Sequence, residues 1–159
     1  MIRISLTALL ALLLAGASYF YLSAAQQDVP GVEADSASFE GFDLTVQPQD
    51  GACWLRYSDG QDSGQVALSV PPPCRFMRDS DGELQRYAEG ERQLITVVGG
   101  TPEKNPIDPL TERPDCGTAV AGIVFSTGTF ATTAYSMGPG VYCAKMGLDQ
   151  RDQWLFLNG

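Results

Sequence analysis

The sequence predicts an all-β fold: a small antiparallel sandwich or barrel of about eight short strands, stapled by two disulfides, after an N-terminal export helix. Three observations predict this fold class. An uncharged apolar run follows the first few residues, apolar and polar residues later alternate with a period of two, and the chain contains four cysteines. Alternation of this kind is typical of strands with one buried face, and glycine-rich turns separate the alternating segments.

The first 25 residues have the pattern of an export signal. Arg3 gives a singly positive start, residues 4–22 carry no charge, and small side chains precede a cleavage point after Ala25. Because the apolar run of about 19 residues approaches the ~20 that span a bilayer, an uncleaved membrane anchor is the alternative. The domain is then expected to be periplasmic or secreted if the signal is cut, and anchored at the inner membrane, outside the cytoplasm, if it is not.

Two further segments follow this leader. Residues 26–37 are small and polar and contain Pro30 and Gly31, which predicts a flexible linker. Residues 38–159 have the length of one ordinary domain and form the predicted disulfide-bonded β domain.

The clearest hairpin in this domain joins residues 53–58 to residues 65–70 across the turn formers of residues 59–64. We expect it to place Cys53 opposite Val70. An irregular first strand is expected at residues 39–46. The other expected strands span residues 84–88, 92–98, 118–126, 129–136, 141–145 and 153–157. After the leader, helical spacing supports at most one turn, at residues 109–113.

The four cysteines predict two disulfides, because an even count in a small exported domain is typical of a disulfide framework. Among the three pairings, we favour Cys53–Cys74 and Cys116–Cys143, since each pair brackets its own hairpin-like segment. Prolines 71–73 are expected to bend the chain so that Cys74 returns to Cys53. Zinc is disfavoured because no two cysteines lie close together in the sequence.

Charge restricts the class of partner. Without the leader, nine Lys and Arg stand against 19 Asp and Glu, a net charge near −10. Nucleic acid is therefore excluded as an expected partner, as is an anionic membrane surface. Membrane contact is expected only through an uncleaved N-terminal segment. A basic protein partner fits the charge, and a general role in solubility is the alternative interpretation.

The sequence also excludes most catalytic chemistry. It has no histidine, which removes Ser-His-Asp and Cys-His catalysis and histidine-ligated metals, and its cysteines are expected to be oxidised. Residues 79–83 resemble the start of a calcium loop, but Gly82 comes two residues too early for the EF-hand pattern. We therefore expect a protein that is not an enzyme and has no cofactor and no metal.

Two sets of residues are candidates for partner binding. Residues 101–117 form an unusually long loop with four prolines, which is typical of functional or disordered segments. Its candidate contact residues are Glu103, Asp108, Glu112 and Asp115. The second set is Trp54 and Arg56, which share one face of a predicted strand and would form a binding hot spot if that face is exposed.

These observations lead to one expectation and two alternatives. The expectation is a non-enzymatic exported binding protein of the bacterial envelope, specifically an inhibitor or immunity protein that blocks a basic exported enzyme such as a cell-wall hydrolase. The first alternative is an anchored structural or assembly subunit of an envelope complex. The second is a carbohydrate-binding module that uses its exposed aromatic residues.

Overall fold

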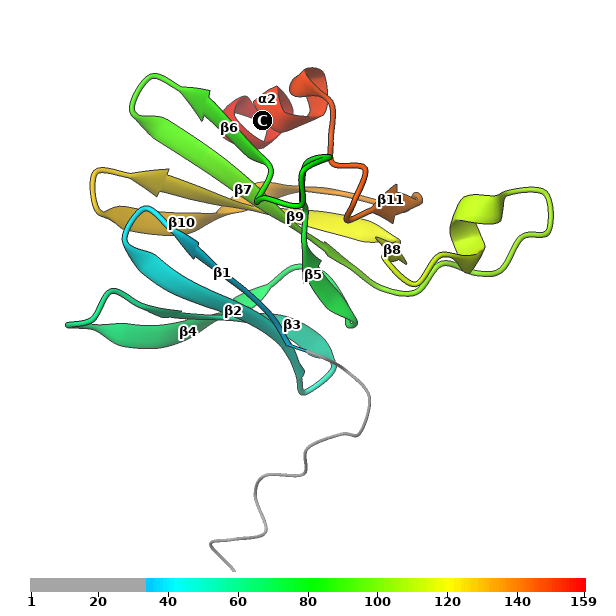
Figure 1. Cartoon of the computed structure of the whole chain (residues 1–159), viewed down its shortest axis with the longest axis horizontal. Coiled ribbons are helices and arrows are strands. Elements are labelled where there is room, and N and C mark those ends of the chain that lie inside the picture. Colours follow the sequence, from blue (N-terminus) through cyan, green and yellow to red (C-terminus); the bar gives the residue numbers. More distant parts are fainter. Residues whose placement is uncertain (1–33) are drawn as a thin grey trace, which may run out of the picture. The chain divides into compact units, whose positions relative to one another are not determined.

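The computed structural model describes residues 34–159 (Figure 1). The predicted export helix and residues 26–33 of the predicted linker lie outside this range. Within it, the chain is mostly antiparallel β structure, which confirms the coarse fold class. No helix in the part that the structure describes is long and apolar enough to span a membrane.

The first sheet is a meander in which each strand pairs with the next along the chain. Its strands are β1 (Asp35–Phe39), β2 (Phe42–Gln49), β3 (Ala52–Ser58) and β4 (Ser63–Leu68), in the order β1-β2-β3-β4. Two-residue turns with positive φ join the first three strands, at residues 40–41 and 50–51. Turns of this kind match the twist of the flanking strands, which explains the tight hairpins.

The second sheet is built around a long central strand. Its members are β5 (Cys74–Phe76), β6 (Arg86–Glu89), β7 (Arg92–Gly99), β9 (Ala119–Ser126) and β10 (Thr129–Met137). Along β7, one edge pairs with β9, while β5 and β6 pair with successive parts of the other edge. The smaller elements are β8 (Cys116–Gly117), β11 (Tyr142–Cys143), the 3₁₀ helix η1 (Pro109–Glu112) and the helix α2 (Gln150–Asn158).

The domain has three layers: the first sheet, the second sheet, and the C-terminal segment with α2 (Figure 1). One apolar cluster lies between the two sheets and includes Leu44, Leu55 and Phe76. A second cluster lies on the other face of the second sheet and includes Leu94 and Phe156. Because both faces of the second sheet are covered, β7 is buried continuously from residue 94 to residue 99, whereas β2 alternates between core and solvent.

Most of the predicted strands are present, with shifted limits. The hairpins at residues 53–68 and 119–137 are confirmed, as is the single helical turn, which is η1. The predicted first strand at residues 39–46 contains the turn between β1 and β2. The predicted strand at residues 141–145 is reduced to the two residues of β11. Strand β1 begins at Asp35, three residues before the predicted start of the domain.

Two predictions about this domain are wrong. Residues 153–157 belong to α2 rather than to a strand, because Asp149 caps a helix whose buried residues, Gln153, Phe156 and Leu157, follow helical spacing. Cys53 faces Leu68 in the β3–β4 register rather than Val70. Its backbone N–H instead donates to the Val70 carbonyl just beyond β4, at 3.0 Å.

Both favoured disulfides are confirmed. Cys53–Cys74 connects β3 of the first sheet to β5 of the second, and so links the two layers that enclose the main core. Cys116–Cys143 joins β8 to β11. Two disulfides indicate an oxidising environment outside the cytoplasm.

Candidate functional site

The segment of residues 101–117, hereafter the proline loop, extends beyond the sheets on the side of β8 (Figure 1). It leaves the end of β7 and returns through β8 to β9. Pro102 is buried at its start, whereas residues 103–107 are all exposed. The loop therefore combines an anchored base with a projecting outer part.

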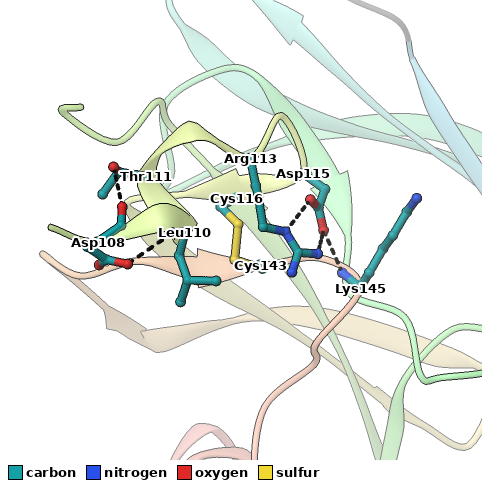
Figure 2. Close-up of a disulfide and its surroundings, with 8 residues drawn as sticks. All are labelled: Asp108, Leu110, Thr111, Arg113, Asp115, Cys116, Cys143 and Lys145. Carbon is teal, nitrogen blue, oxygen red and sulfur yellow. Dashed lines mark hydrogen bonds and ion pairs between the residues drawn. A yellow bond between two sulfur atoms is a disulfide. The ribbon is translucent and has the colours of Figure 1, made fainter. Parts of the chain in front are cut away.

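A disulfide and a hydrogen bond from Lys145 connect the returning limb of the loop to the C-terminal segment, and an ion pair braces the limb itself (Figure 2). The Arg113 guanidinium donates twice to the Asp115 carboxylate, with distances of 3.0 Å from Nε and 2.9 Å from a terminal nitrogen. The backbone N–H of Lys145 also donates to this carboxylate, at 3.4 Å. These hydrogen bonds, chiefly those from Arg113, hold the pKa of the Asp115 carboxyl below its ordinary value.

The outer part of the loop is ordered by its own hydrogen bonds. The hydroxyl of Thr111, a buried residue, lies 2.7 Å from the Asp108 carbonyl and accepts from the Asn105 backbone N–H at 2.9 Å. Asp108 is the N-cap of η1 and accepts from the Leu110 backbone N–H at 3.0 Å. Pro109 takes the first helical position, where its missing N–H costs no hydrogen bond. The loop is therefore a folded element with a defined turn at its tip.

Ile107 occupies this tip and is 89% exposed, the highest value among the large apolar residues at positions 34–159. Its backbone N–H donates to the Asn105 side-chain oxygen at 3.0 Å, which holds the turn on which it lies. A single exposed apolar residue needs no explanation on a flat surface. At the end of a braced, projecting loop, it is positioned to enter a cavity of another molecule.

The four predicted acidic contact residues of the loop fall into two pairs. Asp108 and Asp115 are partly buried and use their carboxylates in the cap and the ion pair described above. Glu103 and Glu112 are exposed and make no ion pair with any residue at positions 34–159. The second pair therefore offers fully exposed carboxylates to a partner, whereas Asp108, which also has no ion pair within this range, is partly buried and accepts a hydrogen bond from Leu110.

Sequence reasoning missed Ile107 and Thr111. The signals that would have found them are the turn formers Asn105-Pro106 and the cap-and-proline pair Asp108-Pro109, which mark a turn followed by a helical start. A lone isoleucine between these two signals lies at the tip. Nothing local in the sequence indicates that Thr111 is buried, because its partners depend on the folded turn.

Trp54 and Arg56 lie on the outer face of the first sheet, whereas Cys53 and Leu55 point into the core. Arg56 is exposed and Trp54 is partly buried, with its indole N–H buried and without a partner among residues 34–159. Their cross-strand neighbours are mostly polar, namely Gln47, Thr45 and Gln65. This face belongs to a different sheet from the one that carries the proline loop, so the two candidate sets form separate surfaces.

No group of three or more potential metal ligands gathers anywhere in residues 34–159. The Asp79 carboxylate accepts from the backbone N–H groups of Asp81 and Glu83, at 2.9 and 3.1 Å, and thereby closes a turn. Comparisons with known protein families, curated proteins and solved structures find no match for this chain.

Proposed function

We propose that this protein is a non-enzymatic binding protein of the bacterial envelope that blocks a basic exported enzyme, with the proline loop entering the partner's cleft. The projecting, internally braced loop with Ile107 at its tip carries this proposal. A periplasmic or secreted location follows from it, and the two disulfides agree with that location.

The rigidity of the loop favours binding. Its base is fixed by Cys116–Cys143, the Arg113–Asp115 ion pair braces its returning limb, and the hydrogen bonds of Thr111 and Asp108 order its tip. A segment that is already ordered loses little conformational entropy when it docks, so more of the contact energy appears as affinity. Loops that insert into enzyme clefts gain most from this kind of pre-organisation.

Ile107 supplies the apolar contact. Full burial of such a side chain is worth about 1.5–3 kcal/mol, and this residue is almost fully exposed before binding. Glu103 and Glu112 flank it in sequence with unpaired negative charge, and the whole described part carries 17 acidic against nine basic side chains. The field of such a molecule accelerates encounter with a basic partner and repels acidic ones.

The test starts from the exported form of the full chain, immobilised and exposed to an envelope extract of its host. The retained protein is purified, and its affinity and its enzymatic activity are measured with the soluble binding protein. We expect a basic exported enzyme whose activity falls on binding. Replacement of Ile107 by Asp should weaken binding about tenfold or more, which corresponds to at least ~1.4 kcal/mol.

Met146→Asp is the matched control, because Met146 is also an exposed large apolar residue but lies outside the loop. We expect its affinity to equal that of the unmodified protein. Recovery of only acidic or neutral partners would contradict the electrostatic part of the proposal. Equal affinity of Ile107→Asp and Met146→Asp would contradict the role of the loop.

A carbohydrate-binding function is the second candidate, favoured by the polar outer face of the first sheet around Trp54. A partly exposed indole among Gln47, Thr45 and Gln65 is the kind of surface on which a sugar ring stacks and forms hydrogen bonds. Glycan-array binding that is lost in Trp54→Ala and kept in Ile107→Asp would favour this candidate over the inhibitor.

A further inference from the structure

A pocket of about 330 Å³ lies between β1, β5 and the segment after β11, and basic side chains gather in its wall. Arg75, Arg78 and Lys145 line this arginine pocket. The only acidic residues that line it are Asp35 and Asp115. Acidic side chains outnumber basic ones almost two to one across residues 34–159, but basic side chains outnumber acidic ones in the wall of this pocket.

Both carboxylates in the wall already have partners. Asp35 accepts from the Phe76 backbone N–H at 2.8 Å and from Arg78 at 2.7 Å. Asp115 is held by Arg113, which does not line the pocket. Both carboxylates of the wall are therefore already paired with arginines of the protein. Two of the three basic side chains in the wall have no such ion-pair partner within residues 34–159.

Arg75 and Lys145 are those two cations. Neither forms an ion pair with any residue at positions 34–159. The Nε of Arg75 is buried and has no hydrogen-bond acceptor within the same range, although a buried donor without a partner costs about 1–3 kcal/mol. The side chain of Lys145 extends away from Asp115, and only its backbone contacts that carboxylate (Figure 2).

We propose that the arginine pocket binds the carboxylate of a small organic acid. The planar guanidinium of an arginine matches a carboxylate in geometry as well as in charge, and a nearby ammonium adds a second donor. A monoanion suits the pocket better than a dianion such as phosphate, because Asp35 and Asp115 stand in the same wall. The volume lies at the lower end of small-molecule sites, which favours a ligand no larger than a hexuronic acid.

This proposal does not depend on the tip of the proline loop or on an enzyme partner. Its test is a nuclear magnetic resonance titration of the full exported chain that follows the Nε–H signals of its arginines. Acetate, glucuronate and inorganic phosphate are added in parallel, with chloride used to keep the ionic strength constant. We expect acetate and glucuronate to shift the Arg75 signal in a saturable way, glucuronate at lower concentration, while the exposed Arg151 does not respond.

Variants then locate the site. We expect Arg75→Ala to weaken glucuronate binding about tenfold or more. Arg75→Lys should weaken it less, because lysine keeps the positive charge but cannot donate the two parallel hydrogen bonds of a guanidinium. Arg151→Ala, on the exposed face of α2, is the matched control and should bind like the unmodified protein.

Three results would overturn the proposal. The first is a linear shift shared by Arg75 and Arg151, which would reflect salt alone. The second is phosphate binding as tight as that of the carboxylates. The third is unchanged glucuronate binding by Arg75→Ala. If this variant does not fold, the titration of the unmodified protein still decides, because the Arg75 signal reports on the site directly.

Discussion

At the scale of single residues, Thr111 determines the shape of the proline loop. Its hydroxyl is bonded both to the Asp108 carbonyl and to the Asn105 N–H, across the turn that carries Ile107. Thr111→Val keeps the shape of the side chain and removes these hydrogen bonds. A hydrogen bond of this kind is worth about 1 kcal/mol net, so we expect roughly fivefold faster hydrogen exchange at the Asn105 amide.

Thr132→Val is the matched control, because Thr132 is exposed on β10, away from the loop. Exchange at Asn105 should be unchanged in this variant. Equal exchange rates in the two variants would show that the loop does not depend on Thr111.

Asp115 gives the loop base a pH dependence. Hydrogen bonds from Arg113 lower its pKa in the folded protein, so the carboxylate stabilises the fold at pH values above its unfolded pKa of about 3.9. This contribution is lost as the pH falls through the lowered folded pKa. We expect Asp115→Asn to be less stable than the unmodified protein by up to about 1 kcal/mol at pH 7, with the difference shrinking as the pH falls below the unfolded pKa.

Urea denaturation of both proteins across this pH range measures the difference. A stability gap that stays constant down to the lowest pH would show that the cost of Asp115→Asn comes from packing rather than from the charge. Asp43→Asn, at an exposed position of β2, should show no comparable gap.

The sequence located this loop but did not reveal which of its acids are available. Prolines, charges and the scarcity of apolar residues mark residues 101–117 as an unusual segment whatever the fold. Asp108 and Asp115 use partners only two residues away, Leu110 and Arg113, but these contacts exist only because the chain folds into the η1 turn and the β8–β11 pairing. No local pattern indicates that pairing, so a single sequence does not show which acids are used inside the protein.

At the scale of elements, α2 depends on its N-cap. The Asp149 side chain accepts from the Asp152 backbone N–H at 2.8 Å, and the helix packs Phe156 and Leu157 against the second sheet. Asp149→Ala should destabilise the protein by about 1 kcal/mol, whereas Asp149→Asn keeps a cap oxygen and should cost only a few tenths. Chemical denaturation measures both, and equal losses would show that the cap is not the cause.

The wrong strand at residues 153–157 and the undivided strand at residues 39–46 have different causes. Residues 153–157 mix apolar and polar side chains and fit both the strand period of two and the helix period of 3.6. Only the capping aspartate, Asp149, distinguishes a helix there. At residues 39–46, Phe39 and Phe42 face the same core, although in one continuous strand an odd and an even position would point to opposite faces. A two-residue turn produces this change of parity, because the residues on either side of it form a cross-strand pair.

At the scale of the whole molecule, the two disulfides should separate stability from binding. They close segments with sequence separations of 21 and 27 residues, and the loop-entropy model gives about 3 kcal/mol for each. Replacing Cys53 and Cys74 together by alanine should lower stability by about that amount and leave the affinity of the folded molecule for the proposed enzyme partner unchanged. The same replacement of Cys116 and Cys143 should lower both.

Urea denaturation and binding measured on the same samples test this difference. Loss of affinity in the Cys53–Cys74 variant, at a temperature where it is fully folded, would contradict the assignment of binding to the proline loop. Retention of full affinity in the Cys116–Cys143 variant would contradict the role of a rigid base.

The disulfide pairing and the all-β class were predictable because they rest on local segments, each bracketed by its own cysteines. The three layers were not. The second sheet is assembled when β5 and β6 meet the same edge of β7, and its second face is covered by α2, an element for which the sequence predicted a strand. The nearly continuous apolar character of β7 and β9 is the sequence signal of burial on both faces.

The meander of the first sheet sets an order for folding. Strands β1 to β4 close through consecutive hairpins, so they need only short-range contacts, which form fast. The apolar inner face of this sheet, however, remains exposed to water until β5, β7 and β9 pack against it, and these strands lie farther along the chain. Because Cys53 lies on β3 and Cys74 on β5, we expect the native Cys53–Cys74 bond to be favoured once the two sheets have packed together. The formation of this one disulfide during refolding should therefore report when the core between the two sheets is closed to water.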